Sequence, residues 1–241
     1  KHTPLYPKIS NRLYNYCTVS PKIYVKNAQD FEKLRRRRIE FAECKGIVHD
    51  DEQKIQDDIQ SCFREFLSVK NLLLSEISLS SSDDVLQNYV DFETVLEKAN
   101  DMSTLSKRLG YGRRVYSLNH PLLGTFPLAF VNVGLTRGVA DSLMYIEKST
   151  GTLELEKKAN TAMFYSICTA PGLHGFSLGN CLIKLAVEKL NEDIFFSKTS
   201  AQFSTLSPIP KFRAWLEDQE ATDILGILVG DQHFDGGKHG A

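Results

Sequence analysis

Residues 203–215, FSTLSPIPKFRAW, pass from a strand pattern through a rigid turn to a helix pattern. Phe203 and the residues around it alternate as in a half-buried strand. Pro208 and Pro210 cannot donate a backbone N–H to a sheet, so the strand must end at Ser207. A helix can begin near Lys211. On one face this helix would carry Phe212, Trp215 and Leu216.

Ser207 therefore lies at the C-terminal end of a predicted strand and is held by a proline-rich turn. Sheet proteins often present ligand-binding side chains at this position. A serine in such a turn can instead hydrogen-bond to the backbone of its own turn. The stretch alone leaves both roles open.

The composition indicates a folded protein of nearly neutral charge. Of the 241 residues, 42% are hydrophobic, and 29 Lys and Arg balance 30 Asp and Glu, which argues against a dedicated nucleic-acid surface. The sequence contains no run of some 18 apolar residues, so no membrane span is expected. The chain begins with Lys1 and ends in a Gly- and His-rich segment, and we interpret both ends as cut.

The cysteines indicate reduced thiols in an intracellular protein. They are odd in number and widely spaced, and no Cys-x-x-Cys is present, which disfavours a disulfide framework or a zinc site. The five are Cys17, Cys44, Cys62, Cys168 and Cys181.

Two amphipathic helices are predicted in the first 75 residues. Asp30 can cap one that runs through Lys45 and stops at Gly46. The second spans residues 50–74, where apolar residues recur at spacings of three and four. We expect an antiparallel pair that ends a partial helical domain, residues 1–75.

Four consecutive arginines, residues 35–38, lie in the first of these helices. Such a run can form an anion-binding patch. Glu32, Glu40 and Glu43 lie nearby, however, and this balance favours a solvated helix face.

Beyond a polar break at residues 78–84, strands and helices alternate in a second domain, residues 76–241. Alternation with period two indicates strands, and apolar spacings of three and four indicate helices. The predicted helices cover residues 85–99, 103–109 and 178–190, and the predicted strands cover residues 113–119, 128–136, 162–168 and 202–206. This order predicts an α/β or α+β layer built on a mixed sheet.

A glycine-rich turn, residues 169–180 (TAPGLHGFSLGN), joins the third predicted strand to the helix that follows. Gly172, Gly175 and Gly179 would let backbone amides approach a ligand, and the helix N-terminus would favour a phosphate or diphosphate. The turn carries neither a Walker pattern nor a dinucleotide fingerprint. A tight strand-to-helix connection explains the same glycines, and both interpretations stay open.

Three segments together resemble the C-terminal catalytic domain of the malonyl-CoA decarboxylase family. They are MFYSI (163–167), PGLHGFSLGNCLIKLAVEKL (171–190) and FSTLSPIPKFRAWL (203–216). The upstream segments DVLQNYV, SKRLGYGRRVYSLNHP and PLAFVNVGLT are similar to that family in the same order. The resemblance covers roughly residues 22–216.

The resemblance implies an α+β fold with a GNAT-like mixed sheet flanked by helices, after a remnant of a helical N-terminal domain. It implies the conversion of malonyl-CoA to acetyl-CoA and CO2 in fatty acid metabolism. Ser207 falls on the family's catalytic serine. The family's malonyl-CoA-binding positions fall on His174, Gly175, Phe176, Ser177, Leu178, Gly179, Asn180 and Ile183.

The family also uses a proton-donor histidine well beyond the serine. His233 and His239 lie in a segment that does not match, so neither is assigned this role. His120 and His174 match other family positions. We therefore expect this chain to bind CoA thioesters weakly and to turn over slowly or not at all.

Other expectations follow from the same resemblance. No metal or organic cofactor is needed, because the thioester itself accepts the electrons. Family members work in mitochondria, peroxisomes or cytoplasm, and a homo-oligomer is expected. Two alternatives stay open, an acyl-CoA-dependent N-acyltransferase and a non-catalytic CoA-binding module.

Overall fold

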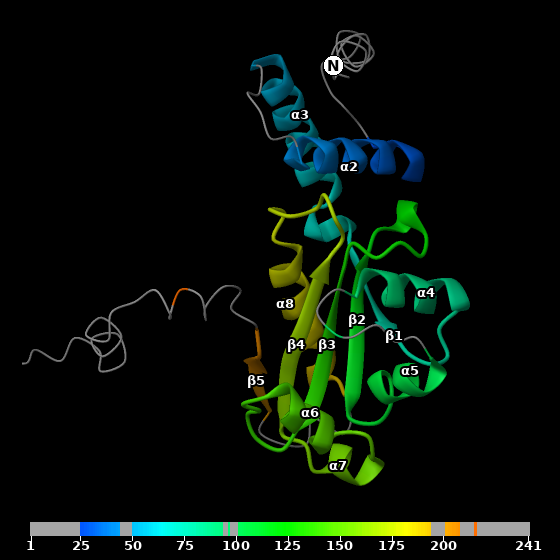
Figure 1. The fold of residues 1–241 in the computed structure, drawn as a ribbon, viewed down its shortest axis with the longest axis vertical. Coiled ribbons are helices and arrows are strands. Elements are labelled where there is room, and N and C mark those ends of the chain that lie inside the picture. The colour runs from blue at the N-terminus through cyan, green and yellow to red at the C-terminus, as the bar shows by residue number, and fades with distance from the viewer. Residues whose placement is uncertain are drawn as a thin grey trace, which may run out of the picture. The chain divides into compact units, whose positions relative to one another are not determined.

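The computed structural model describes residues 25–43, 50–93, 96, 101–193, 201–207 and 215. The chain divides into two compact units, residues 1–206 and 207–241. All helices and strands named below belong to the first unit. They include one five-stranded mixed sheet flanked by helices (Figure 1), which confirms the predicted α+β class.

The sheet has the strand order β1-β2-β3-β4-β5. Neighbours from β1 to β4 are antiparallel, and β4 and β5 are parallel. The strands are β1 (Leu73–Ile77), β2 (Arg113–Asn119), β3 (Ala129–Thr136), β4 (Thr161–Thr169) and β5 (Gln202–Thr205). Four of them were predicted to within one residue at each end. The edge strand β1 was missed.

Strand β5 pairs with only the first part of β4. The register runs from Thr161 opposite Gln202 to Phe164 opposite Thr205. Leu206 then donates its N–H to the Phe164 carbonyl at 2.8 Å. Among the described residues, the β5 side of β4 therefore has no strand partner from Tyr165 onward.

Seven helices and two short 3-10 helices are described. They are α2 (Ala28–Glu43), α3 (Asp50–Phe66), η1 (Val69–Asn71), α4 (Asp83–Phe92), α5 (Met102–Arg108), η2 (Pro121–Leu123), α6 (Leu143–Ser149), α7 (Leu153–Lys157) and α8 (Leu178–Asn191). The helix predicted to continue to residue 74 ends at Phe66, because the chain turns there into η1 and the extended strand β1. The helix predicted to reach Ala99 ends at Phe92, since Glu93 is already extended.

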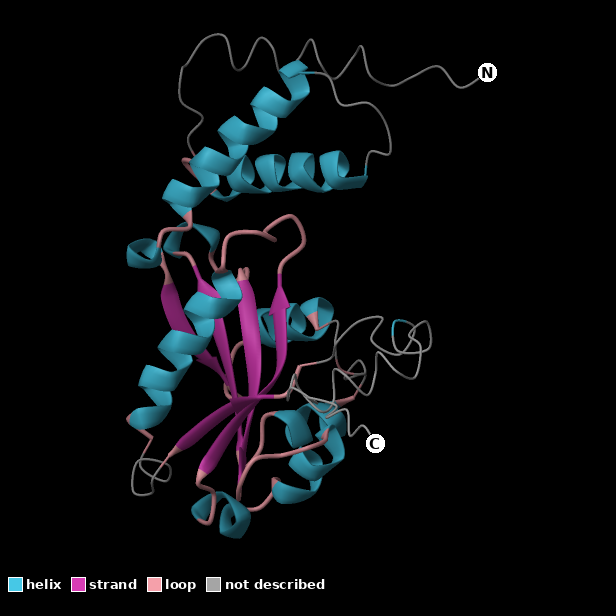
Figure 2. Cartoon of the chain, turned by 90° about the vertical axis from the view of Figure 1, so that its left-hand side faces the viewer, coloured by secondary structure: helices cyan, strands magenta, loops and turns pink. Residues whose placement is uncertain are grey.

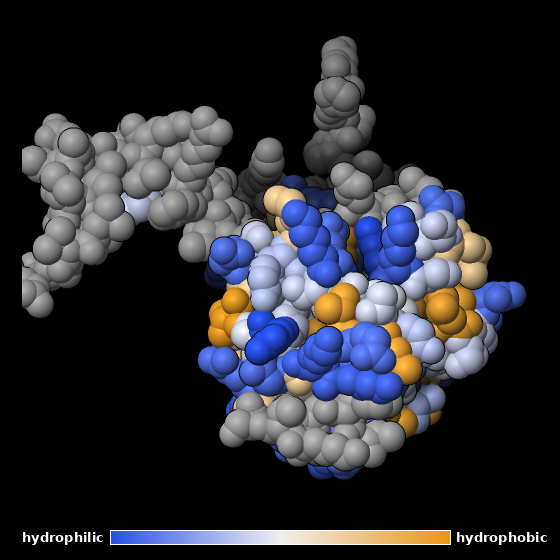
Figure 3. All heavy atoms as spheres, turned by 90° about the horizontal axis from the view of Figure 1, so that it is seen from below, coloured by the Kyte–Doolittle hydropathy of each residue, from blue (hydrophilic) through white to orange (hydrophobic). Residues whose placement is uncertain are grey.

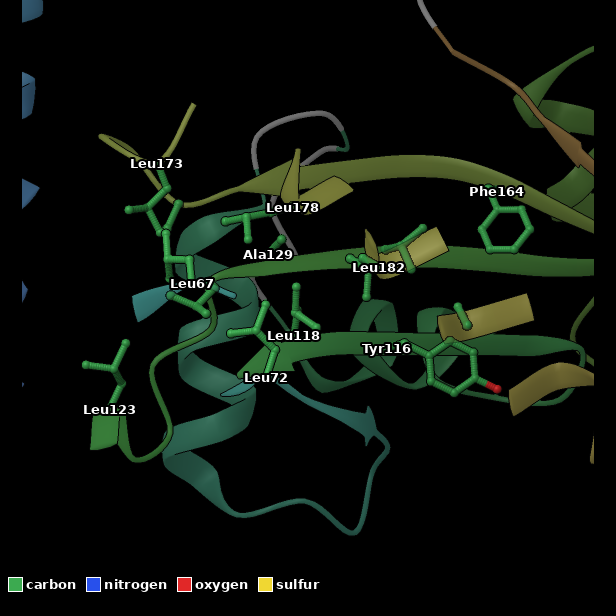
Figure 4. Close-up of a cluster of buried hydrophobic side chains, with 14 of the residues drawn as sticks. Leu67, Leu72, Tyr116, Leu118, Leu123, Ala129, Phe164, Leu173, Leu178 and Leu182 are labelled. Carbon is green, nitrogen blue, oxygen red and sulfur yellow. The ribbon is translucent and has the colours of Figure 1, made fainter. Parts of the chain in front are cut away.

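Helix α8 covers one face of the sheet, and α4 and α5 lie over the other (Figure 2). The α8 face holds the larger core, and Figure 4 shows Leu118, Leu178 and Leu182 among its members. The second predicted strand was expected to place every other residue on one face, and β3 does so. Four of its side chains on the α8 face belong to this core, namely Ala129, Val131, Val133 and Leu135.

Helices α2 and α3 run in opposite directions, as predicted. Phe31 near the start of α2 stacks on Phe63 near the end of α3, with 5.3 Å between ring centroids. Arg37 pairs with Glu52 near the start of α3. Phe31 and Phe63 belong to the same buried cluster as the α8 face of the sheet. The proposed boundary near residue 75 falls inside β1, and a separate helical domain stays a prediction.

None of the helices in the described ranges is long and apolar enough to cross a membrane. Seen from the end that carries α6 and α7, the surface is largely hydrophilic and interrupted by separate hydrophobic groups (Figure 3). Large apolar side chains that are exposed in this region include Leu143, Met144 and Leu155.

Candidate functional site

The predicted glycine turn forms the loop between β4 and α8. Ser177, the N-cap of α8, has a left-handed backbone with φ of 54°, and its side chain makes no capping hydrogen bond. The first-turn amides of Leu178, Gly179 and Asn180 have no acceptor among the described residues, as is usual for an uncapped helix start. Free amides and the positive end of the helix dipole make this loop suited to a phosphate group.

The three glycines of the loop have different structural roles. A Cβ on Gly172 would come within 2.9 Å of the Arg35 carbonyl oxygen, and one on Gly179 within 3.3 Å of Ile167 Cγ2. These two glycines permit close packing within the protein. Gly175 has φ of +89°, and a Cβ added to it would meet no atom within 4 Å. Of the three, Gly175 is the one whose open surroundings suit a ligand.

Two arginines of α2 hold the loop by its backbone carbonyl groups. Arg35 Nη1 donates to the Pro171 carbonyl at 2.8 Å. Arg38 Nε donates to the Gly172 carbonyl at 2.9 Å, and its guanidinium lies 4.8 Å from the centre of the Phe176 ring. These contacts fix the path of the loop between β4 and α8.

The prediction that residues 35–38 form a solvated helix face is therefore correct for only part of the run. Arg36, with 71% of its side chain exposed, pairs with Glu32 in solvent. Arg35 and Arg37 are 12% and 15% exposed. Sequence showed the arginines but not their partners, because the loop carbonyls bonded by Arg35 and Arg38 lie more than 130 residues away.

The predicted substrate-binding residues differ in what they expose. Leu178 is buried in the core, and Phe176 and Ile183 pack against it from partly buried positions. Gly179 is half-buried where it meets Ile167. The loop surface is formed by the exposed residues His174, Gly175, Ser177 and Asn180.

Ser207 is exposed and directly follows Leu206 after β5. It is the first residue of the second compact unit, residues 207–241. The predicted proline turn and most of the helix from Lys211 lie outside the described residues. The same is true of His2, His49, His233 and His239.

His120 has a structural task. Its Nδ1 accepts a hydrogen bond from the Leu122 N–H at 3.2 Å, which caps η2. Its ring stacks on Phe66 at a centroid distance of 3.9 Å, and burial lowers its pKa. Burial thus favours the neutral ring, which an acceptor at Nδ1 requires.

A buried carboxylate that sequence did not reveal lies on the opposite face of the sheet. Glu93, only 2% exposed, accepts hydrogen bonds from Asn132 Nδ2 at 2.9 Å and Ser166 Oγ at 3.1 Å. Tyr89 donates its hydroxyl to Asn132 Oδ1 at 2.7 Å. A single acidic residue after a helix gives no signal of such a network, since its partners come from β3 and β4.

The described part of the chain has no cluster of three metal-ligating side chains. The cysteines in this part of the chain form no disulfide bond, and their redox state stays a prediction. They are Cys62, Cys168 and Cys181.

Known proteins resemble this chain in sequence and in structure. The malonyl-CoA decarboxylase of Anser anser anser, described as mitochondrial, is 34% identical over 187 residues, which are 76% of this chain and 36% of the relative. The mitochondrial enzyme of Mus musculus is 31% identical over 211 residues, 86% of this chain and 40% of the relative. The chain thus spans less than half the length of these curated relatives.

Among solved structures, the malonyl-CoA decarboxylase of Agrobacterium vitis matches with a TM-score of 0.68 and 28% identity over 84% of this chain and 50% of that one. The Rhodopseudomonas palustris enzyme matches with a TM-score of 0.65 and 29% identity, covering 86% of this chain and 52% of that one. The family profile of the malonyl-CoA decarboxylase C-terminal domain matches residues 70–233, which include β1 to β5, the glycine loop and Ser207. This chain therefore belongs to the malonyl-CoA decarboxylase family.

Proposed function

We propose that this chain binds malonyl-CoA at the β4–α8 loop and converts it to acetyl-CoA and CO2, slowly because no histidine of this chain is assigned as the proton donor. The observation that carries the proposal is the uncapped start of α8, where backbone amides are free beside the open Gly175. A diphosphate is the part of CoA that such amides would bind. The family to which the chain belongs supplies the identity of the acyl group.

In the proposed reaction, the bond between the α-carbon and the carboxylate of the malonyl group breaks. CO2 leaves, and the bonding electron pair moves onto the thioester as an enolate. One proton then adds to the α-carbon and gives acetyl-CoA. The thioester is the electron sink, so the reaction as written requires no cofactor.

Ser207 is the proposed catalytic residue. Its hydroxyl would hydrogen-bond to the acyl group and help to transfer the proton to the α-carbon. A positioned group of this kind typically contributes a factor of about 100 to 10,000 to the rate. Donors that meet the developing enolate oxygen would contribute further.

The test is to add malonyl-CoA and to measure acetyl-CoA and CO2 over time. We expect acetyl-CoA and CO2 in equal amounts, and Ser207→Ala should lower the rate about 100-fold or more. The matched control is Ser61→Ala, at an exposed position of α3, which should keep the rate of the parent chain.

Two results would overturn the proposal. Acylation of amines by acetyl-CoA, without CO2 release from malonyl-CoA, would favour an N-acyltransferase. Tight binding of CoA thioesters without any turnover would instead identify a binding module.

The mitochondrial relatives support a mitochondrial location for this chain. Peroxisomal or cytoplasmic location and a homo-oligomeric state stay predictions. Size-exclusion chromatography with light scattering would determine the number of chains in the assembly.

A further inference from the structure

Two neighbouring arginines of β2 have contrasting surroundings. Arg114 Nη2 contacts two carboxylates, Glu156 Oε1 at 2.6 Å and Asp193 Oδ2 at 2.7 Å. Arg113 Nε donates to Thr150 Oγ1 at 2.7 Å, and its Nη1 donates to the Tyr165 hydroxyl oxygen at 2.6 Å. Within the described ranges, Arg113 makes no ion pair, although it is partly buried.

An arginine removed in part from water normally acquires an anionic partner. For Arg114 the protein supplies two. For Arg113 the described residues supply two hydroxyl groups, and its Nη2 has no acceptor among them. The charge of Arg113 is thus left available to an anion from outside.

Tyr165 adds a second unused donor. It is 4% exposed, and burial raises its pKa, so the hydroxyl keeps its proton. Its oxygen accepts from Arg113, and its own proton has no acceptor among the described residues. A buried hydroxyl proton without an acceptor is costly, which favours a ligand that can accept it.

Both side chains line one cavity of about 1030 Å³ between α5, α6 and the sheet. Lys107 and Arg108 also line it, whereas Glu147 is the one acidic residue in its described lining. The volume is at the upper end of the range typical of small-molecule sites. The positive charge and the two donors favour an anion with paired oxygen atoms, which describes a carboxylate.

The cavity also lies at a suitable distance along β4 from the glycine loop. Tyr165 is the first residue of β4 beyond the pairing with β5, and the glycine loop begins after Thr169. Four strand residues span roughly 13 Å. A ligand held by its diphosphate at the loop would need an extended arm to reach Tyr165, and CoA carries its acyl group on such an arm.

We propose that Arg113 and Tyr165 bind a carboxylate, and that this carboxylate is the free one of the malonyl group. The second half of this assignment rests on the proposed function, whereas the affinity for a carboxylate does not. The pair would be a specificity determinant, because acetyl-CoA lacks the group that they bind.

The experiment is calorimetric titration of the chain with malonyl-CoA, acetyl-CoA and free malonate. We expect malonyl-CoA to bind about 10- to 100-fold more tightly than acetyl-CoA, as one charge-assisted contact provides. Arg113→Gln should bring this ratio close to one and abolish malonate binding, with the acetyl-CoA affinity unchanged. Arg113→Lys should keep part of the ratio, and Arg36→Gln should leave it intact.

Loss of the bonds from Arg113 to Thr150 and Tyr165 can also affect folding, so Tyr165→Phe provides a second test. It removes one hydroxyl and should lower the malonyl-CoA to acetyl-CoA ratio about three- to tenfold. An unchanged ratio in either folded variant would overturn the carboxylate site and leave the proposed function standing. Conversely, Arg113-dependent malonate binding in a chain that binds neither thioester would support the site and overturn the proposed function.

Discussion

At the scale of single residues, Gly175 offers a direct test of the loop. Its φ of +89° is strained for any residue with a side chain, yet a Cβ there meets nothing within 4 Å. Gly175→Ala should therefore cost about 1 kcal/mol of folding free energy. Because the strain would shift the amides that we propose to bind the diphosphate, we expect malonyl-CoA to bind about tenfold more weakly by calorimetry.

Gly138 provides the matched control, with φ of +82° and equally open surroundings. Gly138→Ala should cost a similar amount of stability and leave malonyl-CoA affinity unchanged. Equal effects of the two substitutions on affinity would mean that the loop does not contact the ligand.

At the scale of elements, helix α2 positions the loop through Arg38. Arg38→Gln removes the bond to the Gly172 carbonyl and the contact with the Phe176 ring. A lost hydrogen bond from a charged group costs about 1.5–3 kcal/mol. We expect a lower melting temperature and, because the loop is held less firmly, about fivefold weaker binding of malonyl-CoA.

Arg36→Gln is the control in the same helix, since Arg36 is 71% exposed and pairs only with Glu32 in the described contacts. An exposed ion pair contributes at most about 1 kcal/mol, so affinity should not change. Weaker binding in both variants would point to general charge attraction and not to positioning by Arg38.

Most elements with a clear period could be predicted from the sequence. Strand β2 and helix α8 were predicted at nearly their observed bounds, because their apolar residues repeat with the right spacing. Strand β1 was missed because it lies at the edge of the sheet. Only Ile77 of this strand is buried, so buried and exposed residues do not alternate along it. Five to seven residues give too little periodicity, so the short helices α6 and α7 were missed. The equally short α5 was found because Gly110 marks its end.

The candidate site was predictable only in part, for a related reason. The loop glycines follow one another in sequence and could be recognised as a group. The contacts of Arg38 with the loop, and of Arg113 with Tyr165, join residues that are far apart in sequence. Such pairs depend on how the elements pack, which local patterns do not encode.

At the scale of the first unit, the two N-terminal helices and the sheet share a buried core. Phe63 of α3 is fully buried, stacks on Phe31 and meets the loop residue Phe176 at a centroid distance of 5.8 Å. Helices that bury their apolar face against a sheet should not unfold separately from it. We therefore expect residues 25–206 to unfold in one cooperative transition.

Phe63→Ala tests this coupling, because it removes a ring on which both parts pack. It should cost about 3–5 kcal/mol, whereas Val69→Ala, at a 59% exposed position, should stay within about 0.5 kcal/mol. Hydrogen exchange of the variant should show protection falling together in α3, β3 and β4. If α2 and α3 lost protection while β3 and β4 kept theirs, the helical segment would be an independent domain. The contacts of α2 with the glycine loop would then not depend on the shared core.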